Sequence, residues 1–296
     1  MRAASAAIAT ALPIASLFDG VHTRRAATPI KRVSRATHEN LLLAALPREA
    51  YQKLLPGLSP VTLTFGDVLY EPGSRMRDIY FPLSCLVSLL TVVEGHLALE
   101  VGMVGREGMV GVPLALGIEA SPVRALVQGG GAALQLSKAG FLSALRSTPS
   151  LQRGLNSYVY TLMAQISQTA ACNRFHVVGP RLARWLLMTR DRVGSAEFRM
   201  THEFLSHMLG VRREGVTEAA SDFQRQNLIE YSRGKIRILD HSRLEAAACS
   251  CYRLAAAEPG AIARWRPARK QAAGAARRTS GGSIHIRRFN SFLTTP

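Results

Sequence analysis

The sequence predicts an α+β chain with an N-terminal antiparallel β-barrel or jelly roll, a long dimerisation helix and a C-terminal winged helix-turn-helix. Three observations lead to this fold class. Short apolar runs of period two fill residues 60–136, one apolar stripe of helical period runs along 151–177, and two helices with a hairpin follow over 201–240. The expected parts are a disordered extension (1–38), a barrel (39–147), the long helix (148–178), the winged helix-turn-helix (179–254) and a disordered basic tail (255–296).

The two ends of the chain differ in composition from its centre. The formal net charge is +17, and most of this surplus lies in 1–38 and 255–296, which are rich in Ala and Arg. Such basic tails favour loose attraction to nucleic acid without indicating a specific site. Ala6–Leu17 is mildly apolar and follows Arg2, as in a signal peptide, but Pro13 interrupts it. We therefore expect an extension or an over-long start.

The four cysteines, Cys85, Cys172, Cys249 and Cys251, include no CxxC pair and no Cys/His run of zinc spacing. We therefore expect no metal site and no cofactor, and we interpret Cys249-Ser-Cys251 as an inert pair within an Ala-rich helix. Free thiols fit a reducing cytoplasm. No apolar run reaches the roughly 18 residues that a membrane span needs, so no membrane partner is expected.

Residues 39–147 begin with helix signals and continue with strand signals. A short helix pair broken at Pro47 is expected over Glu39–Leu55. The strands expected after it are Val61–Phe65, Val68–Tyr70, Ile79–Phe81, Leu86–Val93, Leu97–Val104, Val123–Val127 and Ala133–Leu136. Gly and Pro turns separate them, which is typical of an antiparallel barrel or jelly roll that can hold a small ligand. Ser137–Leu145 then begins a helical part.

The apolar stripe along Leu151–Val177 predicts a helix of roughly seven turns. Its positions are Leu155, Tyr158, Val159, Leu162, Ile166 and Thr169. Either the stripe packs on the chain's own barrel, or it pairs with the same helix of a second copy. We favour the homodimer, because paired reading helices bind paired half-sites. Gly179-Pro180 is expected to separate this helix from the next one, Arg181–Val193.

Residues 201–240 carry the most specific pattern in the chain. Thr201 is expected to cap a helix that ends at Gly210, because glycine adopts the left-handed corner of a helix-turn-helix. A second helix follows, with Val216, Ala219, Ala220 and Phe223 facing inward. Ile229–Ile238, with a Ser-Arg-Gly turn at its centre, predicts a hairpin wing. Asp240 should cap a last helix that continues to about Leu254.

The first turn of the second helix carries Arg212, Arg213 and Glu214, where a helix-turn-helix enters the major groove. An Arg can bridge guanine O6 and N7, and a Glu can accept from cytosine N4. Reading of double-stranded DNA is therefore favoured over a merely solvated pair of charges. The candidates for phosphate contacts in the wing are Arg233, Lys235 and Arg237.

With its parts in this order, Glu39–Leu254 resembles the Crp–Fnr family of bacterial transcription regulators. The family's Gly-x-Ser-Arg-Glu-x-Val signature has its counterpart in Gly210–Val216. The resemblance implies a dimeric, cytoplasmic, sequence-specific DNA-binding regulator that is not an enzyme and that contacts RNA polymerase if it activates. It implies base contacts by Arg213, Glu214, Thr217 and Glu218, and phosphate contacts by Thr201, His202, Arg212, Arg233, Lys235 and Arg237. Glu218 stands where a family member has a second base-reading Arg, so the operator is expected to differ.

The barrel departs further from the family's cyclic-nucleotide-binding pattern. The Gly-Glu-Leu that supplies a ribose contact is missing, and Arg124 stands one place later than the Arg that binds the cyclic phosphate. A slip of one residue turns a strand side chain to the other face unless a bulge restores it. We therefore expect an unknown effector, with Glu107, Gly111 and Arg124 as its candidate pocket. The N-terminal cysteine cluster that holds an iron–sulfur centre in part of the family is missing, whereas haem ligation by His96 or Cys85 stays open.

Three alternatives to an effector-controlled, sequence-specific regulator are left open. They are a non-specific, nucleoid-like DNA binder that acts through the basic tails, a cyclic-nucleotide-responsive regulator, and a cupin-like metalloenzyme. The first predicts steep salt dependence without sequence preference. The last needs several ligands on neighbouring strands, and His96 is the only histidine in the predicted barrel.

Overall fold

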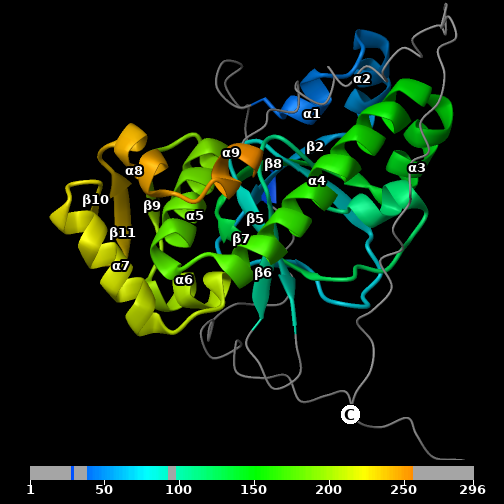
Figure 1. Cartoon of the computed structure of the whole chain (residues 1–296). Helices are drawn as coiled ribbons and strands as arrows, with labels where there is room; N and C mark the ends of the chain where they lie inside the picture. Colours follow the sequence, from blue (N-terminus) through cyan, green and yellow to red (C-terminus); the bar gives the residue numbers. More distant parts are fainter. Residues whose placement is uncertain (1–27, 30–38, 93–97, 256–296) are drawn as a thin grey trace, which may run out of the picture.

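The computed structural model describes residues 28–29, 39–92 and 98–255, and Figure 1 shows their arrangement. A β-rich N-terminal part carries the long helix α4 (Pro149–Phe175) along one side, and the winged helix-turn-helix lies beside it (Figure 1). His96, the C-terminal tail and all of 1–38 except the short strand β1 (Thr28–Pro29) lie outside the described residues. Among the described helices, none combines the length and apolar character that a membrane crossing requires.

Two four-stranded antiparallel sheets form the N-terminal part, with strand orders β1-β2-β8-β4 and β3-β7-β5-β6. The strands are β2 (Ser59–Leu63), β3 (Val68–Tyr70), β4 (Asp78–Pro82), β5 (Leu86–Thr91), β6 (Leu99–Val104), β7 (Arg124–Gly129) and β8 (Gly131–Ser137). Each of these overlaps a strand expected from the period-two pattern. The sheets stay separate instead of closing into a barrel, so the jelly-roll form of the prediction is confirmed. We call β1–β8 the jelly roll.

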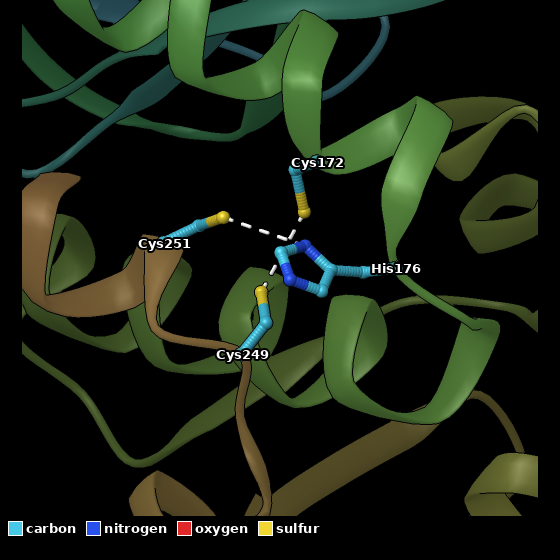
Figure 2. Close-up of side chains that lie close together, drawn as sticks. All are labelled: Cys172, His176, Cys249 and Cys251. Atoms are coloured by element: carbon cyan, nitrogen blue, oxygen red, sulfur yellow. Dashed lines mark hydrogen bonds between the residues drawn. The ribbon is translucent and has the colours of Figure 1, made fainter.

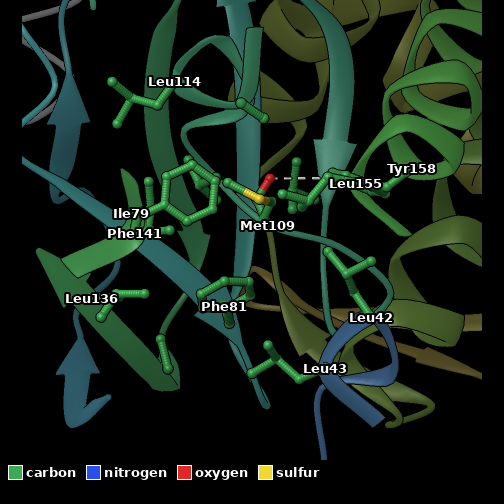
Figure 3. Close-up of a cluster of buried hydrophobic side chains, with 14 of the residues drawn as sticks. Leu42, Leu43, Ile79, Phe81, Met109, Leu114, Leu136, Phe141, Leu155 and Tyr158 are labelled. Atoms are coloured by element: carbon green, nitrogen blue, oxygen red, sulfur yellow. Dashed lines mark hydrogen bonds between the residues drawn. The ribbon is translucent and has the colours of Figure 1, made fainter. Parts of the chain in front are cut away.

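Buried apolar side chains fill the space between the sheets (Figure 3). Phe81 of β4, Met109 and Phe141 are fully enclosed there, each worth about 1.5–3 kcal/mol of burial. The helices that add side chains to this core are α1 (Leu41–Ala44), α2 (Arg48–Leu54), the 3-10 turn η3 (Val112–Leu116), α3 (Lys138–Ser147) and the start of α4. A second 3-10 turn, η2 (Leu55–Gly57), leads from α2 into β2. The predicted helix pair around Pro47 is confirmed by α1 and α2.

The long helix α4 spans Pro149–Phe175, as the helical stripe predicted. The stripe, however, faces the chain's own jelly roll. Gln165 accepts a hydrogen bond from the Met103 N–H at 2.9 Å and donates to the Met103 carbonyl at 3.1 Å. Leu162 is 7% exposed, and its Cδ1 would lie 3.7 Å from a Cβ placed on Gly102 of β6. The assignment of this stripe to a second copy is therefore wrong, because β6 already covers it.

The break between α4 and α5 (Val178–Val193) lies at His176–Val177. Gly179 and Pro180 belong to the first turn of α5, where a proline is tolerated because its missing N–H has no helical partner. The predicted break at these two residues is therefore too late in the sequence. The end of α4 and the start of α5 are instead joined by the short extended link at His176–Val177.

The C-terminal part is a helix-turn-helix with a three-stranded wing. Its elements are β9 (Glu197–Arg199), α6 (His202–Leu209), α7 (Arg213–Arg225), β10 (Ile229–Ser232), β11 (Lys235–Ile238), α8 (His241–Ala247) and α9 (Cys251–Ala255). The predicted hairpin is confirmed, and β9, which the sequence did not reveal, pairs with the free side of β11. The predicted last helix is broken after Ala247. There Ala248 is extended, and the Cys249 N–H leaves the helical pattern and donates to the Pro180 carbonyl at 3.3 Å.

Helices α5 and α6 pack directly on the jelly roll. One continuous core joins strand residues to helix residues, among them Leu86, Leu90, Met103 and Leu126 from the jelly roll with Leu182, Trp185, Leu186 and Leu205 from the helices. The Phe204 ring of α6 also lies 5.7 Å from the ring of Phe65. The inner side of the winged helix-turn-helix is therefore buried, which leaves α7 and the wing on the outside (Figure 1).

Candidate nucleic-acid interface

Gly210 forms the corner between α6 and α7. Its φ of 62° and ψ of 43° are left-handed, and its N–H donates to the carbonyls of Ser206 and His207. The predicted left-handed glycine corner is therefore confirmed. The structure adds a second reason for glycine, since a Cβ here would lie 2.6 Å from Leu99 Cδ1 of β6. The start of α7 is thus held against the jelly roll as well as against α6.

The outer face of α7 carries the four residues predicted to contact bases. The inner face is buried through Val216, Ala219, Ala220 and Phe223. On the other side Arg213, Glu214, Thr217 and Glu218 are exposed. The three charged members form no ion pair within the residues that the structure describes. Their hydrogen-bonding groups are therefore available to base edges.

His202 and Thr217, by contrast, already have partners. The Thr217 hydroxyl donates to the Arg213 carbonyl at 3.0 Å, so it accepts from His202 Nδ1, also at 3.0 Å. The His202 ring stacks on Tyr231 of the wing with ring centroids 4.1 Å apart. Burial, and then the Arg213 charge, lower the pKa of His202 below its ordinary 6.5, so the ring is neutral at pH 7. His202 therefore joins α6, α7 and the wing, and any phosphate contact it makes is uncharged.

The two helix starts hold the next pair of predicted phosphate contacts. The Thr201 hydroxyl accepts from the Phe204 N–H at 3.1 Å, which confirms the predicted cap of α6. Arg212 occupies the cap position of α7 without a side-chain capping bond, and its side chain is exposed. The partial positive charge of a helix N-terminus adds to that of Arg212, so this point suits the phosphate contact that the sequence predicts.

The three predicted cations of the wing differ in their acidic partners. Arg233 lies at the tip with a left-handed φ of 48°, as a tight hairpin turn requires. Lys235 Nζ is 2.7 Å from Glu197, and Arg237 is 3.4 Å from Glu197 and from Glu230. In the described part of the chain only Arg233 of these three has no acidic partner. The structure thus ranks Arg233 first among the predicted wing contacts.

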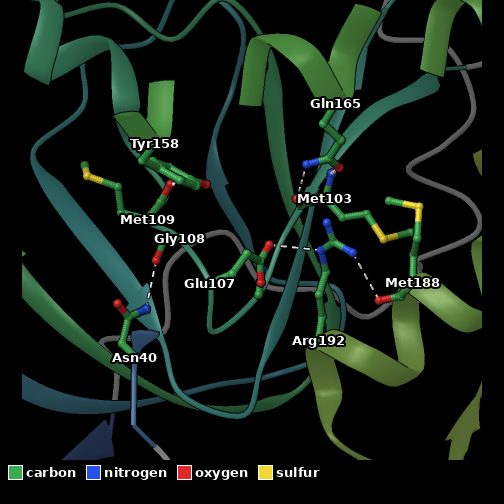
Figure 4. Close-up of polar contacts among 10 residues, drawn as sticks. Asn40, Met103, Glu107, Gly108, Met109, Tyr158, Gln165, Met188 and Arg192 are labelled. Atoms are coloured by element: carbon green, nitrogen blue, oxygen red, sulfur yellow. Dashed lines mark hydrogen bonds and ion pairs between the residues drawn. The ribbon is translucent and has the colours of Figure 1, made fainter. Parts of the chain in front are cut away.

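The residues predicted for an effector pocket have separate partners. Glu107 forms a largely buried ion pair with Arg192 of α5, with Nε 2.9 Å from Oε1 (Figure 4). Arg124 pairs with Glu71 at 2.9 Å. Gly111 has a φ of 107°, and a Cβ there would lie 2.6 Å from a side chain of β4. None of the contacts among the described residues joins the three, so an effector pocket at these positions stays a prediction.

Glu100 of β6 is a buried carboxyl at the contact between the jelly roll and α5. It accepts hydrogen bonds from Ser88 Oγ at 2.6 Å and from Trp185 Nε1 at 2.9 Å. Burial raises the pKa of Glu100 to about 7, although both hydrogen bonds and the charges of Arg184 and Arg192 act to lower it. A group that titrates near neutral pH therefore lies between the two parts of the molecule.

The face of α4 opposite the jelly roll exposes large apolar side chains. Tyr160 is 68% exposed and Met163 is 63% exposed. Ala164, Ser167 and Ala171 continue this exposed face at helical spacing. Small residues beside two large apolar ones let a second helix approach closely. This face, and not the predicted stripe, is the one that a partner helix could cover.

Four metal-ligating side chains from two distant segments of the chain lie together. The donor atoms of Cys172, His176, Cys249 and Cys251 are all within 4.8 Å of one another. Cys172 and His176 are four positions apart, so a helix places them on one face, and a Cys-x-Cys pair supplies the rest. Neither pair is a zinc motif alone, and Cys172 and Cys249 are 77 positions apart. The signal in the sequence that could have found this group is the presence of both pairs in one chain.

Comparisons with known proteins agree with this geometry. Residues 180–247 match the family model of the Crp-like helix-turn-helix domain. Similar solved structures include FixK2 from Bradyrhizobium japonicum (12% identity, 65% of this chain and 98% of that chain, TM-score 0.57), the c-di-GMP-responsive global regulator CLP of Xanthomonas campestris (14%, 66% and 100%, 0.54) and a CRP-family transcriptional regulator from Thermus thermophilus (20%, 63% and 95%, 0.53). A comparison with curated proteins gives no match. The fold that the resemblance implied is therefore confirmed.

Proposed function

We propose that this chain, which has the fold of the Crp–Fnr regulators, is a sequence-specific DNA-binding transcription regulator that acts as a homodimer. The observation that carries the proposal is the exposed first turn of α7, directly after the Gly210 corner. There Arg213 and Glu214 stand on the outer face without intramolecular ion pairs among the described residues, and Arg212 stands beside them at the helix start. This arrangement suits binding to a nucleic acid.

The two charged residues at the start of α7 suit direct reading of a G·C pair or two neighbouring pairs. The Arg213 guanidinium can donate to both O6 and N7 of guanine, and the Glu214 carboxylate can accept from N4 of cytosine. Each good contact of this kind discriminates against a wrong base by about 1–3 kcal/mol. Arg212 and Arg233 flank the reading turn and neutralise phosphates, which sets the register without reading sequence.

The dimer rests on the exposed face of α4. Tyr160 and Met163 would be buried against the same residues of a second copy, as a two-fold interface requires. Two copies of α7 would then reach successive major grooves about 34 Å apart. A signal received by the jelly roll would act by shifting α5 relative to α4 and so changing that spacing.

Selection of random duplexes by the purified full-length chain, followed by sequencing, tests this function. We expect a two-fold-symmetric motif whose half-sites lie about one helical turn apart and contain G·C pairs. Binding without an enriched motif that weakens steeply with salt would instead support the non-specific binder acting through the basic tails.

The interface on α4 has its own test. Met163→Glu places a charge in the exposed face, and we expect light scattering to give half the mass of the parent protein. Leu239→Glu is the matched control, because Leu239 is also a half-exposed apolar residue but lies outside α4. A parent protein that is already a monomer, or a Met163→Glu variant that keeps the full mass, would reject this interface. Leu162→Glu is unsuitable, because it would disrupt the jelly-roll contact.

A further inference from the structure

We propose that Cys172, His176, Cys249 and Cys251 bind one zinc ion at the junction between α4 and the winged helix-turn-helix. Figure 2 shows the four side chains converging on a common centre from two segments of the chain. Three thiols and one imidazole are a donor set that zinc takes up in closed structural sites. The proposal rests on these residues alone and stands independently of the DNA-binding function.

Two of the distances between donor atoms match those around a single tetrahedral ion, and the others are within its reach. Cys172 Sγ and Cys249 Sγ are 3.6 Å apart, and Cys251 Sγ is 3.5 Å from His176 Nδ1. With a Zn–S bond of about 2.3 Å and a Zn–N bond of about 2.0 Å, tetrahedral geometry gives about 3.8 Å between sulfurs and about 3.5 Å between sulfur and nitrogen. An iron–sulfur cluster would spread its ligands over several irons, whereas all four donors here lie within 4.8 Å of one another.

The local backbone explains why the two pairs meet. Cys172 lies in the last turn of α4 and His176 is its C-terminal cap residue, so both project from the same end of the helix. The break between α8 and α9 carries Cys249, whose N–H is held by the Pro180 carbonyl of α5. Cys251 then begins α9, which packs along α4. A continuous helix over 240–254 would have prevented this convergence.

The surroundings suit an anionic metal centre. Zinc with three thiolates and a neutral imidazole carries a net charge of −1, which needs a nearby cation when buried. Arg184 of α5 is 4% exposed, and its Nε and Nη1 have no hydrogen-bond partner among the described residues. Its charge is close enough to act on both Cys172 and Cys249. Gln168 Nε2 also donates to Cys251 Sγ at 2.9 Å, as outer-shell donors do around metal-bound sulfur.

Zinc at this position would hold the C-terminal segment in place. Cys172, Cys249 and Cys251 form a small buried cluster of their own, separate from both large cores. Few apolar side chains therefore fix the break and α9 against α4. A four-ligand ion would tie the end of α4 to the winged helix-turn-helix and so limit how far the two can rotate.

The test uses the full-length chain, purified under reducing conditions without a polyhistidine tag after growth with added zinc. Elemental analysis should give one zinc per chain. Replacement by Co²⁺ should produce the strong visible bands of a tetrahedral ion together with thiolate-to-cobalt charge transfer in the near ultraviolet. Ellman's reagent should find four free thiols after unfolding with a chelator, and the cluster thiols should be protected in the zinc-loaded protein.

Variants locate the ion. Cys251→Ser and His176→Ala should weaken Co²⁺ binding by more than the roughly 10–100-fold that outer-shell changes cost. Cys85→Ala is the matched control, because Cys85 is also buried but belongs to the jelly-roll core, and it should keep one zinc per chain. The Co²⁺ spectrum of the parent protein serves as the readout should a variant fail to fold.

Three results would overturn the proposal. The first is parent protein that takes up neither zinc nor Co²⁺ in its reduced form. The second is equal metal loss in Cys85→Ala and Cys251→Ser, which would place the ion elsewhere. The third is protein purified in parallel without reductant that holds no metal and has only two free thiols after unfolding, which would indicate a Cys172–Cys249 disulfide in place of a metal site.

Discussion

The two sides of the winged helix-turn-helix use charged residues in opposite ways. On the outer side, Arg213, Glu214 and Arg233 are exposed and have no ion-pair partners among the described residues. On the inner side, Arg192 and Trp185 of α5 are buried and donate hydrogen bonds to the jelly-roll carboxylates of Glu107 and Glu100. The outer charges are therefore available to a ligand, and the inner charges hold the domain in place. Changes on the inner side should alter stability, and changes on the outer side should alter only DNA binding.

The largest effect is expected from Arg192→Met. This change leaves the Glu107 carboxylate largely buried without its cation, and Glu107 Oε2 already has no partner among the described residues. Removing one member of a buried ion pair costs about 3–5 kcal/mol of unfolding free energy, measured by urea denaturation at pH 7. The double variant Glu107→Gln/Arg192→Met should recover part of the loss, because no unpaired charge is left. Equal losses in the single and the double variant would show that packing, and not charge, dominates here.

The second prediction concerns the pH dependence that Glu100 creates. Its pKa is raised from an ordinary 4.5 to about 7 by burial, so between these values the folded protein binds a proton that the unfolded chain has lost. Stability from this group is therefore complete below about pH 4.5 and falls as pH rises to about 7, by up to about 3 kcal/mol. Urea denaturation from pH 5 to 8 should show this fall in the parent protein. Glu100→Gln should flatten it, and parallel pH curves for the two proteins would contradict the assignment.

The contacts between α5 and the jelly roll could not be predicted from the sequence. Periodicity located β2–β8, α4 and the hairpin wing, because apolar spacing is set within a few residues of each element. The glycine corner at Gly210 was predictable for the same local reason. The pairing of Glu107 with Arg192 spans 85 positions and depends on how α5 docks on the jelly roll. No local pattern encodes that docking.

The long helix shows the same limit in another form. Its apolar stripe was predicted correctly as a face, but periodicity cannot say what covers a face. Leu162 packs beside Gly102 of β6, so the stripe is internal. The group of Cys172, His176, Cys249 and Cys251 was not predictable for a further reason. The break after Ala247 is accompanied by a hydrogen bond from the Cys249 N–H to Pro180 in a different helix, which no local pattern shows. The exposed outer face of α7, which needs no distant contact, was predictable from its own spacing.

The third prediction tests the outer side. Arg213→Ala should cost about 1–3 kcal/mol of binding free energy on the selected operator and relax preference at one base pair. Its unfolding free energy should stay within about 0.5 kcal/mol of the parent, because the side chain is exposed. Arg225→Ala, at the exposed far end of the same helix, is the matched control and should keep the base preference. Equal affinity loss on every sequence would assign Arg213 to phosphate instead.

The smallest effect is expected in the wing, where two neighbouring cations differ in their partners. Arg233 has no ion pair in the described part of the chain, whereas Lys235 is held 2.7 Å from Glu197. A cation that neutralises a phosphate contributes about 0.9 to the slope of log affinity against log salt concentration. Arg233→Gln should therefore lower that slope by nearly this amount, with no change in base preference, in affinity measurements over a salt series.

Lys235→Gln is the variant with which Arg233→Gln is compared. The charge of Lys235 is already partly neutralised by Glu197, so its loss should change the slope by clearly less than the loss of Arg233. If Glu197→Gln is added to the parent protein, Lys235 is released and the slope should increase. Equal slopes for Arg233→Gln and Lys235→Gln would mean that the ion pairs across the wing open freely on binding. The cations of the wing would then contribute equally to phosphate contacts, and net charge alone would determine how the wing contacts the DNA backbone.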